Sequence, residues 1–291
     1  MKTTEIFYPS SRNYHITFIN ASGEEFPIEP PDYLLLDFSG FELPTSDIQM
    51  TKAPYQDGKT FIDDLFEERY PVLEFAIFGS QEEILNRRLI VNRIFNPRSG
   101  PGILRFQNIS TYELEVITKS ISFVDSTKTT HGMVVIQLIA PNPFWYDPIE
   151  VQEVMIGFSG GWSYSWSYPV SYGQIGTQLM VNNIGSIETP VRIYLYGRLE
   201  NPTIKNLTTD QEISITKTIE DGEILIINTA FGEKSAMILS GGEYINAFEY
   251  VHPDSEFWSL VPGENQLIYT VSSEGENAEC RILYNHRFVG V

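Results

Sequence analysis

The sequence predicts a mainly β protein of two domains, and three observations support that prediction. Aromatic residues make up 13% of the 291 residues, with 18 Phe and 16 Tyr, and such side chains favour pleated, half-buried surfaces. A single stretch, 80–97, has the periodicity of an amphipathic helix. Beyond residue 147, short strand-like runs alternate with Gly- and Pro-rich turns, which is typical of a β-sandwich or barrel. We therefore expect an α+β domain at 1–147 and an all-β domain at 148–291.

The first domain is predicted to combine short strands, one helix and a long hairpin. YHITFIN (14–20) alternates apolar and polar residues as a half-buried strand does, and RYPVLEFAIFG (69–79) follows as a strand with apolar residues on both faces. Asp57-Gly58 signals a turn within the run 50–66. Two strand-like runs on either side of a polar loop predict a long hairpin at 112–140.

The helix prediction rests on local signals at both ends of SQEEILNRRLIVNRIFNP (80–97). Ser80 and Glu83 have the spacing of a capping box, and Pro97 ends the pattern. An apolar face follows from the helical spacing. Its predicted members are Ile84, Val91, Ile94 and Phe95, flanked by Leu85 and Leu89.

The stretch IAPNPFWYDP (139–148) is predicted to be a stiff joint between the two domains. Its three prolines fix the backbone dihedral φ, and the style of the sequence changes there from mixed α+β to all-β. We expect its three aromatic side chains, Phe144, Trp145 and Tyr146, to pack between the two halves.

The second domain begins with a row of aromatic residues at period two. Trp162, Tyr164, Trp166 and Tyr168 would share one face of an extended chain, so they form a candidate binding site for a partner or a glycan. The alternative is that this row is an inner face of the sandwich. Further along, Asp221-Gly222 predicts a tight hairpin.

Composition argues against several functions. The formal net charge of −19 without a basic patch argues against nucleic-acid binding, and we find no secretory signal and no apolar run long enough for a bilayer. The lone Cys280 excludes an intrachain disulfide framework. The four histidines lack ligand spacing, and no nucleotide or hydrolase motif occurs. We therefore expect no catalytic residue, no metal and no cofactor.

An ordered set of motifs resembles one family, the distal tail proteins of long-tailed bacteriophages. The first domain contributes DGKTFIDD, EERYPVLEFAIFG, NRRLIVNRIFNPRSGPGILRF and MVVIQLIAPNPFWYD. The second contributes SYSWSYPVSYG, VNNIGSIETPVRIYLYG, NPTIKNLTT, GEILIINT and FWSLVPGENQLIYT. Each match is weak alone, but the ordered set covers about residues 50–291.

This resemblance implies a non-enzymatic structural protein of the virion. The first domain would form a homohexameric ring at the distal end of the tail tube, and the second would be a galectin-like β-sandwich. Its partners would be the tail tube protein, the tail-tip hub and receptor-binding or baseplate proteins, with assembly in the host cytoplasm. DNA would only pass through the acidic lumen, and no membrane would be bound.

Two segments of the sequence suit this role, and two alternative functions remain. The strand at 69–79 and the hairpin at 112–140 are candidate edges for pairing with a neighbouring copy. One alternative is a carbohydrate-binding module acting through the row Trp162–Tyr168. The other is a tail-associated glycosidase, for which the adjacent acidic pairs Asp63-Asp64, Glu67-Glu68 and Glu82-Glu83 are weak candidates.

Overall fold

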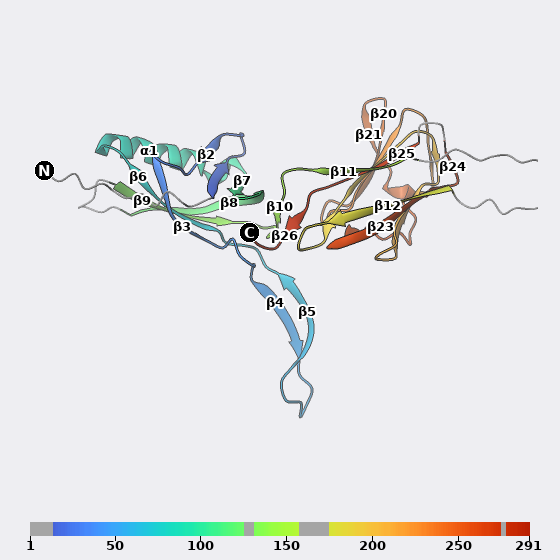
Figure 1. The fold of residues 1–291 in the computed structure, drawn as a ribbon, viewed down its shortest axis with the longest axis horizontal. Coiled ribbons are helices and arrows are strands. Elements are labelled where there is room, and N and C mark those ends of the chain that lie inside the picture. The colour runs from blue at the N-terminus through green and yellow to red at the C-terminus, as the bar shows by residue number, and fades with distance from the viewer. Residues whose placement is uncertain (1–13, 125–130, 157–174, 275–277) are drawn as a thin grey trace, which may run out of the picture. The chain divides into compact units, whose positions relative to one another are not determined.

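The structure is a computed structural model, which describes residues 14–124, 131–156, 175–274 and 278–291. The chain forms two compact units (Figure 1): Met1–Pro148 together with Phe288–Val291, and Ile149–Arg287. The chain therefore passes from one unit to the other twice. Residues 288–291, which the sequence analysis assigned to the second domain, cluster with the first unit.

The body of the first unit is built from two antiparallel sheets that share one long strand, β8 (Thr111–Val124). One sheet has the order β2-β1-β7-β8, and the other has the order β8-β9-β6-β3. A register shift between Thr118 and Ser120 lies where β8 passes from one sheet to the other. The remaining bounds are β1 (His15–Ile19), β2 (Glu25–Pro27), β3 (Tyr33–Ser39), β6 (Val72–Phe78), β7 (Gly102–Gln107), β9 (His131–Ile139) and β10 (Trp145–Tyr146).

The helix α1 (Gln81–Ile94) forms as the sequence predicts, and its N-terminus shows why. Ser80 accepts a hydrogen bond from the backbone of Glu83, whose carboxylate accepts one from the backbone of Ser80, so the capping box is complete. Val91, Ile94 and the next residue, Phe95, are buried against the sheets. A short 3-10 helix, η1 (Pro97–Ser99), follows and ends the α-helical path.

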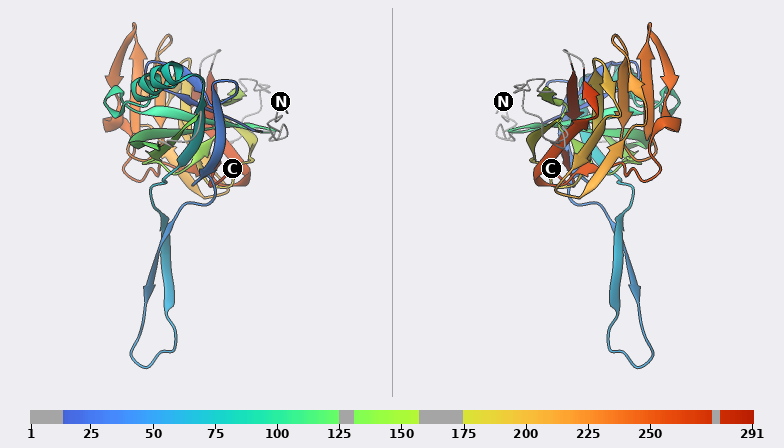
Figure 2. Two further views of the ribbon diagram at one scale, coloured as in Figure 1. Left: turned by 90° about the vertical axis from the view of Figure 1, so that its left-hand side faces the viewer. Right: turned by 90° about the vertical axis from the view of Figure 1, so that its right-hand side faces the viewer.

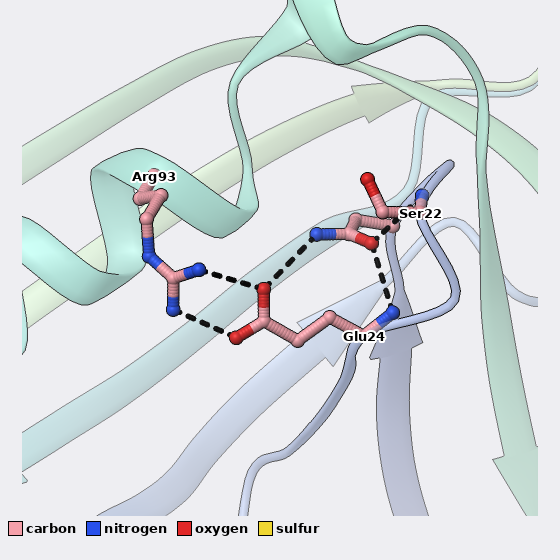
Figure 3. Close-up of polar contacts among 4 residues, drawn as sticks. Ser22, Glu24 and Arg93 are labelled. Atoms are coloured by element: carbon pink, nitrogen blue, oxygen red, sulfur yellow. Dashed lines mark hydrogen bonds and ion pairs between the residues drawn. The ribbon is translucent and has the colours of Figure 1, made fainter.

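An ion pair ties the last turn of α1 to the turn between β1 and β2. Figure 3 shows Arg93 donating two hydrogen bonds to the Glu24 carboxylate, at 2.8 and 2.7 Å. The same turn is braced by the Asn20 side chain, which accepts hydrogen bonds from the backbone of Ser22 and Glu24. Both charged side chains are well exposed, so this contact orients the helix more than it stabilises the unit.

A two-stranded hairpin in the first unit pairs with no other described strand. Its strands are β4 (Ser46–Thr51) and β5 (Thr60–Phe66), and we call residues 46–66 the arm. Figure 2 shows the arm from two sides as a separate ribbon. Nearly every arm side chain is exposed, so the arm adds almost nothing to the core of its own unit.

The second unit is a β-sandwich with a six-stranded sheet (β11-β25-β14-β19-β20-β21) and a four-stranded sheet (β12-β23-β16-β17). The six-stranded sheet comprises β11 (Val151–Ile156), β25 (Glu279–Tyr284), β14 (Arg192–Tyr196), β19 (Ile224–Asn228), β20 (Ser235–Ser240) and β21 (Glu243–Asn246). The four-stranded sheet comprises β12 (Ile175–Asn183), β23 (Gly263–Val271), β16 (Thr203–Asn206) and β17 (Gln211–Ser214).

Short pairings complete the described part of the second unit. β13 (Thr189–Pro190) pairs with β22 (Ser259–Leu260), and β15 (Leu199–Glu200) pairs with β18 (Thr218–Ile219) and β24 (Ser273–Glu274). A short 3-10 helix, η2 (Phe248–Tyr250), follows β21, and β26 (Arg287–Phe288), where the chain returns to the first unit, pairs with β10. Aliphatic side chains from both sheets and Trp258 fill the core between them. The predicted fold class, mainly β with one helix and a C-terminal sandwich, is confirmed over the described residues.

Asp221-Gly222 forms a tight turn but not the predicted hairpin. The Glu223 amide donates to the Glu220 carbonyl, and Gly222 has a φ of 86°, which favours glycine. The strands on either side belong to different sheets, because β18 pairs with β15 whereas β19 pairs with β14 and β20. Asp221-Gly222 determines only the turn, while burial of the side chains of β18 and β19 determines which strands each of them pairs with.

Candidate interaction surfaces

Of the two segments expected to offer free edges, 69–79 lies inside a sheet of the first unit and 112–140 does so only in part. The strand predicted at 69–79 corresponds to β6, which has β9 on one side and β3 on the other. The hairpin predicted at 112–140 corresponds to β8 and β9. β9 is paired on both sides, whereas β8 pairs with β7 up to Val116 and beyond it, among the described strands, with β9 alone. The backbone groups of β6 and β9 are therefore already used, and one edge of β8 beyond Val116 is not. Residues 69–79 are apolar on both faces because β6 is a central strand.

Trp145, one of the three predicted joint residues, lies in the core of the first unit. It is fully buried, with its ring 5.0 Å from Phe41 and 6.4 Å from Phe106. Phe144 contacts Phe66 at the base of the arm, with the two rings edge to face and their centres 5.8 Å apart. These two rings therefore anchor the proline-rich stretch to the first unit.

Tyr146, the third joint residue, pairs with Glu113 of β8 and is half-buried. Burial and the nearby carboxylates Glu113 and Glu115 raise the pKa of its phenol to about 12. The phenol is therefore a neutral hydrogen-bonding group at neutral pH, and Tyr146 contributes no charge to the joint.

Arg69 is a buried cation that fastens three segments of the first unit together. Its guanidinium donates to the carbonyls of Pro143 at 2.8 Å and Val289 at 2.6 Å. It also donates to the carbonyls of Gly40 at 3.1 Å and Glu42. Arg69 is only 3% exposed, and burial lowers its pKa to about 10, so it stays charged at neutral pH.

These carbonyls belong to the loop that leads to the arm, the proline-rich stretch and residues 288–291. The backbone of Arg69 also pairs with Ala140, the last residue before the prolines. One side chain therefore holds the base of the arm and both points where the chain leaves or rejoins the first unit. Sequence reasoning missed this role because a lone arginine in RYPVLEF carries no signal of burial.

The arm exposes an unusual amount of apolar surface for a hairpin without a covering layer. Phe61, Ile62 and Leu65 are each 59% exposed, Ile48 is 53% and Met50 is 48% exposed. Met50 lies directly opposite Phe61, whereas Ile48 lies opposite Asp64, and the register shifts between Gln49 and Met50. An isolated two-stranded hairpin is marginally stable in water, so a partner surface would stabilise it.

The sequence contained a partial signal for the arm. Asp57-Gly58 marked the turn, and Gly58 has the left-handed φ of 77° that the turn requires. Apolar residues on both strands, in a segment also carrying Asp63 and Asp64, do not fit a strand with one face on its own core. That combination is the feature that could have identified the arm from the sequence.

The remaining sequence candidates are dispersed or lie beyond the described residues. The row Trp162, Tyr164, Trp166 and Tyr168 lies outside them. On α1, Leu85 is 56% and Leu89 is 67% exposed, so the apolar face is narrower than predicted. In the part of the chain that the structure describes, no three His, Cys, Asp or Glu side chains gather as a metal site would require.

The acidic pairs do not form a cleft. Asp63 and Asp64 lie on the exposed arm, Glu67 and Glu68 follow it, and Glu82 and Glu83 lie in the first turn of α1. Successive residues of a strand point to opposite faces, so Asp63 and Asp64 cannot face each other across a substrate. None of the described helices is both long and apolar enough to cross a membrane.

Comparison with known proteins supports the resemblance seen in the sequence. Residues 184–288 match the family model described as siphovirus-type tail component, C-terminal domain. No curated protein matches the chain. Most of the second unit is therefore similar to this tail-component domain, and the predicted resemblance is confirmed over residues 184–288.

Solved phage structures have a similar fold over most of the chain. One is the crystal structure of the Dit protein of phage SPP1, described as a paradigm of the hub adsorption apparatus in phages that infect Gram-positive bacteria. The TM-score is 0.69 at 12% identity, covering 94% of this chain and 99% of that one. Two others come from the activated baseplate of phage P2, with Ca and with Sr, each with a TM-score of 0.53, 12% identity, 96% coverage of this chain and 99% of that chain.

Proposed function

We propose that this chain, whose residues 184–288 carry a siphovirus tail-component domain, forms a hexameric adaptor ring at the distal end of a phage tail tube. The ring would link the tube to the tail tip or baseplate and dock receptor-binding or tail-tip proteins. The protein would assemble in the host cytoplasm and reside in the virion. It would act without catalysis, as a structural part.

The observation that carries this proposal is the family match over residues 184–288, together with a shared fold over almost the entire chain. The matched proteins come from a hub adsorption apparatus and a baseplate. Fold alone does not determine function, but a family match and a fold match that point to the same assembly are two separate supports.

The arm supports self-assembly through the first unit. A ring requires each copy to offer one surface and accept a different one, so that head-to-tail contacts close. Residues 46–66 are an offered surface of this kind, since the apolar side chains of Phe61, Met50 and Ile48 are left exposed by their own unit. The arm replaces the edge at 69–79 as the candidate contact, because β6 is interior, while β8 beyond Val116 pairs with β9 alone among the described strands and stays a second candidate edge.

Charge is compatible with a ring around DNA. Each copy carries a formal charge of −19, and acidic side chains facing the lumen would let DNA pass without binding. Locating the charges in an experimental ring structure tests this part, and a basic inner wall would contradict it.

The proposal is tested with the purified full chain by native mass spectrometry and electron microscopy. We expect particles of six copies with a central hole of tail-tube dimensions. A monomer at the concentrations reached during phage assembly would overturn the ring. Binding of glycans by the monomer, lost on Trp162→Ala or Trp166→Ala, would instead favour the carbohydrate-binding alternative.

A further inference from the structure

The geometry points to the outer face of the six-stranded sheet as a docking site for a second tail protein, one with an apolar centre flanked by basic side chains. This inference rests on the proposed function and adds which surface of the second unit is used and what chemistry its partner has. The two outer faces of the sandwich differ in polarity.

The outer face of the four-stranded sheet is polar, as expected of a surface in contact with water. Asn182 lies opposite Glu264 and Lys205 lies opposite Glu212, while Ile268 and Met180 are its apolar members. Its side chains bond mainly to each other, such as Gln266 to Gln178 at 3.2 Å. Burying this face would remove many polar groups from water.

The outer face of the six-stranded sheet carries apolar residues from β11, β14, β19 and β20 in two of its rows. β25 contributes Arg281 and Glu279 to these rows, and the third row, Arg192, Asn228 and Ser235, is polar. The strand register aligns two rows, and we call their members the tyrosine face. One row is Val154, Arg281, Tyr194, Ile226, Met237 and Asn246. The other is Ile156, Glu279, Tyr196, Ile224, Leu239 and Tyr244.

These strands lack the alternation that a water-facing sheet shows. β14, β19 and β20 place buried aliphatic residues such as Ile193, Leu225 and Ile238 inward, and they carry further apolar residues outward. Strands that are apolar on both faces are typical of sheets covered on both sides. The tyrosine face has the composition of an interface core, with Tyr, Met and Arg and few charges.

The charged groups of the tyrosine face are already neutralised within it. Arg281 forms an ion pair with Glu279, and its guanidinium lies 4.7 Å from the ring centre of Tyr196. The rings of Tyr194 and Tyr196 stack at 6.5 Å. A partner can therefore cover this centre without leaving a buried charge unpaired, which is the usual cost of such burial.

Charged residues of both signs border the tyrosine face. Arg192, paired with Glu150, and Lys234 lie beyond the row of Met237, whereas the turns where β19 and β21 begin are acidic. Asp221 and Glu223 lie at the first turn, and Glu243 begins β21. A second copy of this chain, with the same carboxylates and a net charge of −19, would be repelled by these residues. A partner with lysine or arginine around an apolar patch is complementary in both respects, so we assign the site to such a partner.

Photo-cross-linking in assembled phage tails tests this assignment, using two methionines as a matched pair. A photo-reactive phenylalanine analogue replaces Met237 on the tyrosine face, or Met180 on the outer face of the four-stranded sheet. We expect position 237 to give roughly tenfold more cross-linked product than position 180, joined to a different tail protein at a peptide containing Lys or Arg. Higher salt during isolation should lower the yield, because salt screens the acidic border.

The outcomes separate this inference from the ring proposal. A cross-link to a second copy, or equal yields at both positions in intact tails, overturns the docking site while leaving the ring standing. Strong protection of Tyr196 from hydroxyl-radical labelling in the free protein also overturns it, since the face would then be covered before any partner binds. Failure to form six-copy particles counts against the ring instead.

A second variant checks the result without the photo-reactive group. Met237→Glu should lower incorporation of the cross-linked tail protein by about tenfold or more, because a carboxylate would be buried in the interface. Met180→Glu should leave incorporation unchanged. Both variants should still form six-copy particles, and loss of incorporation in both would contradict the site.

Discussion

The body and the arm of the first unit place the same kinds of residue in opposite environments. Phe95 in the body is fully buried, with its ring stacked on Phe18 at 4.2 Å, whereas Phe61 on the arm is 59% exposed. Burial of apolar surface stabilises a fold only where it occurs within that fold. The difference shows that the body buries its own apolar residues, whereas the apolar residues of the arm are suited to contact another molecule.

The largest expected effect comes from truncating the same residue type in both regions. Phe95→Ala should lower the free energy of unfolding by about 3–5 kcal/mol, because it leaves a cavity in a packed core. Phe61→Ala should change it by about 0.5 kcal/mol or less in the monomer, since little of that ring is buried. Urea unfolding of monomeric protein followed by circular dichroism measures both, and equal losses would show that the arm is part of the core.

Removing the buried cation at the base of the arm should have the next largest effect. Arg69→Met leaves the carbonyls of Pro143, Val289 and the arm's leading loop without their donor, at a cost of about 3 kcal/mol. The exposed Arg98→Met is the matched control and should be nearly neutral. Differential scanning calorimetry gives the comparison, and similar melting temperatures for both variants would contradict the fastening role of Arg69.

The arm should show its effect in assembly instead of stability. Phe61→Asp should weaken ring formation by about tenfold or more, because it places a charge in an apolar contact. Phe231→Asp is the matched control, since Phe231 is 97% exposed on the second unit. Analytical ultracentrifugation over a concentration series reports the shift, and a ring unaffected by Phe61→Asp would remove the arm from the interface.

The smallest effect concerns the exposed pair of Glu24 and Arg93. The hydrogen bond from Arg93 lowers the pKa of Glu24 below its ordinary value of 4.5. A carboxylate with a lowered folded pKa stabilises the fold above the unfolded pKa, and this contribution is lost as the pH falls through the folded pKa. Glu24→Gln should therefore lower the melting temperature slightly at pH 7, and the difference should vanish well below pH 4.5. A difference that persists in acid would assign the effect to packing.

Local features of the sequence predicted local structure well. Ser80 and Glu83 lie three residues apart, so their capping box needs nothing from the rest of the chain, and α1 begins where they predict. The predominance of β-structure likewise follows from aromatic and β-branched composition. The turns at Gly58 and Gly222 form for the same local reason.

Long-range pairing could not be read from the sequence. The run 69–79 is apolar on both faces whether its edge is free or paired, and only the positions of β3 and β9 show that β6 is central. Similarly, Trp145 reads as a joint residue among prolines, but its burial depends on Phe41 and Phe106 from distant segments. The tyrosine face could not be recognised from the sequence, because its two rows combine residues from five strands between 151 and 284, with β21 at the border.

Residues 288–291 have a consequence for how the protein is made on the ribosome. Val289 accepts a hydrogen bond from Arg69, and the amide of Val291 donates to Phe41, so the first unit includes residues translated after the entire second unit. Domains generally fold in order during translation. Here the hydrogen bonds of the buried Arg69 cannot all form until residues 288–291 have been synthesised. We therefore expect the base of the arm to reach its final structure only then, and chains truncated before residue 288 to be less stable.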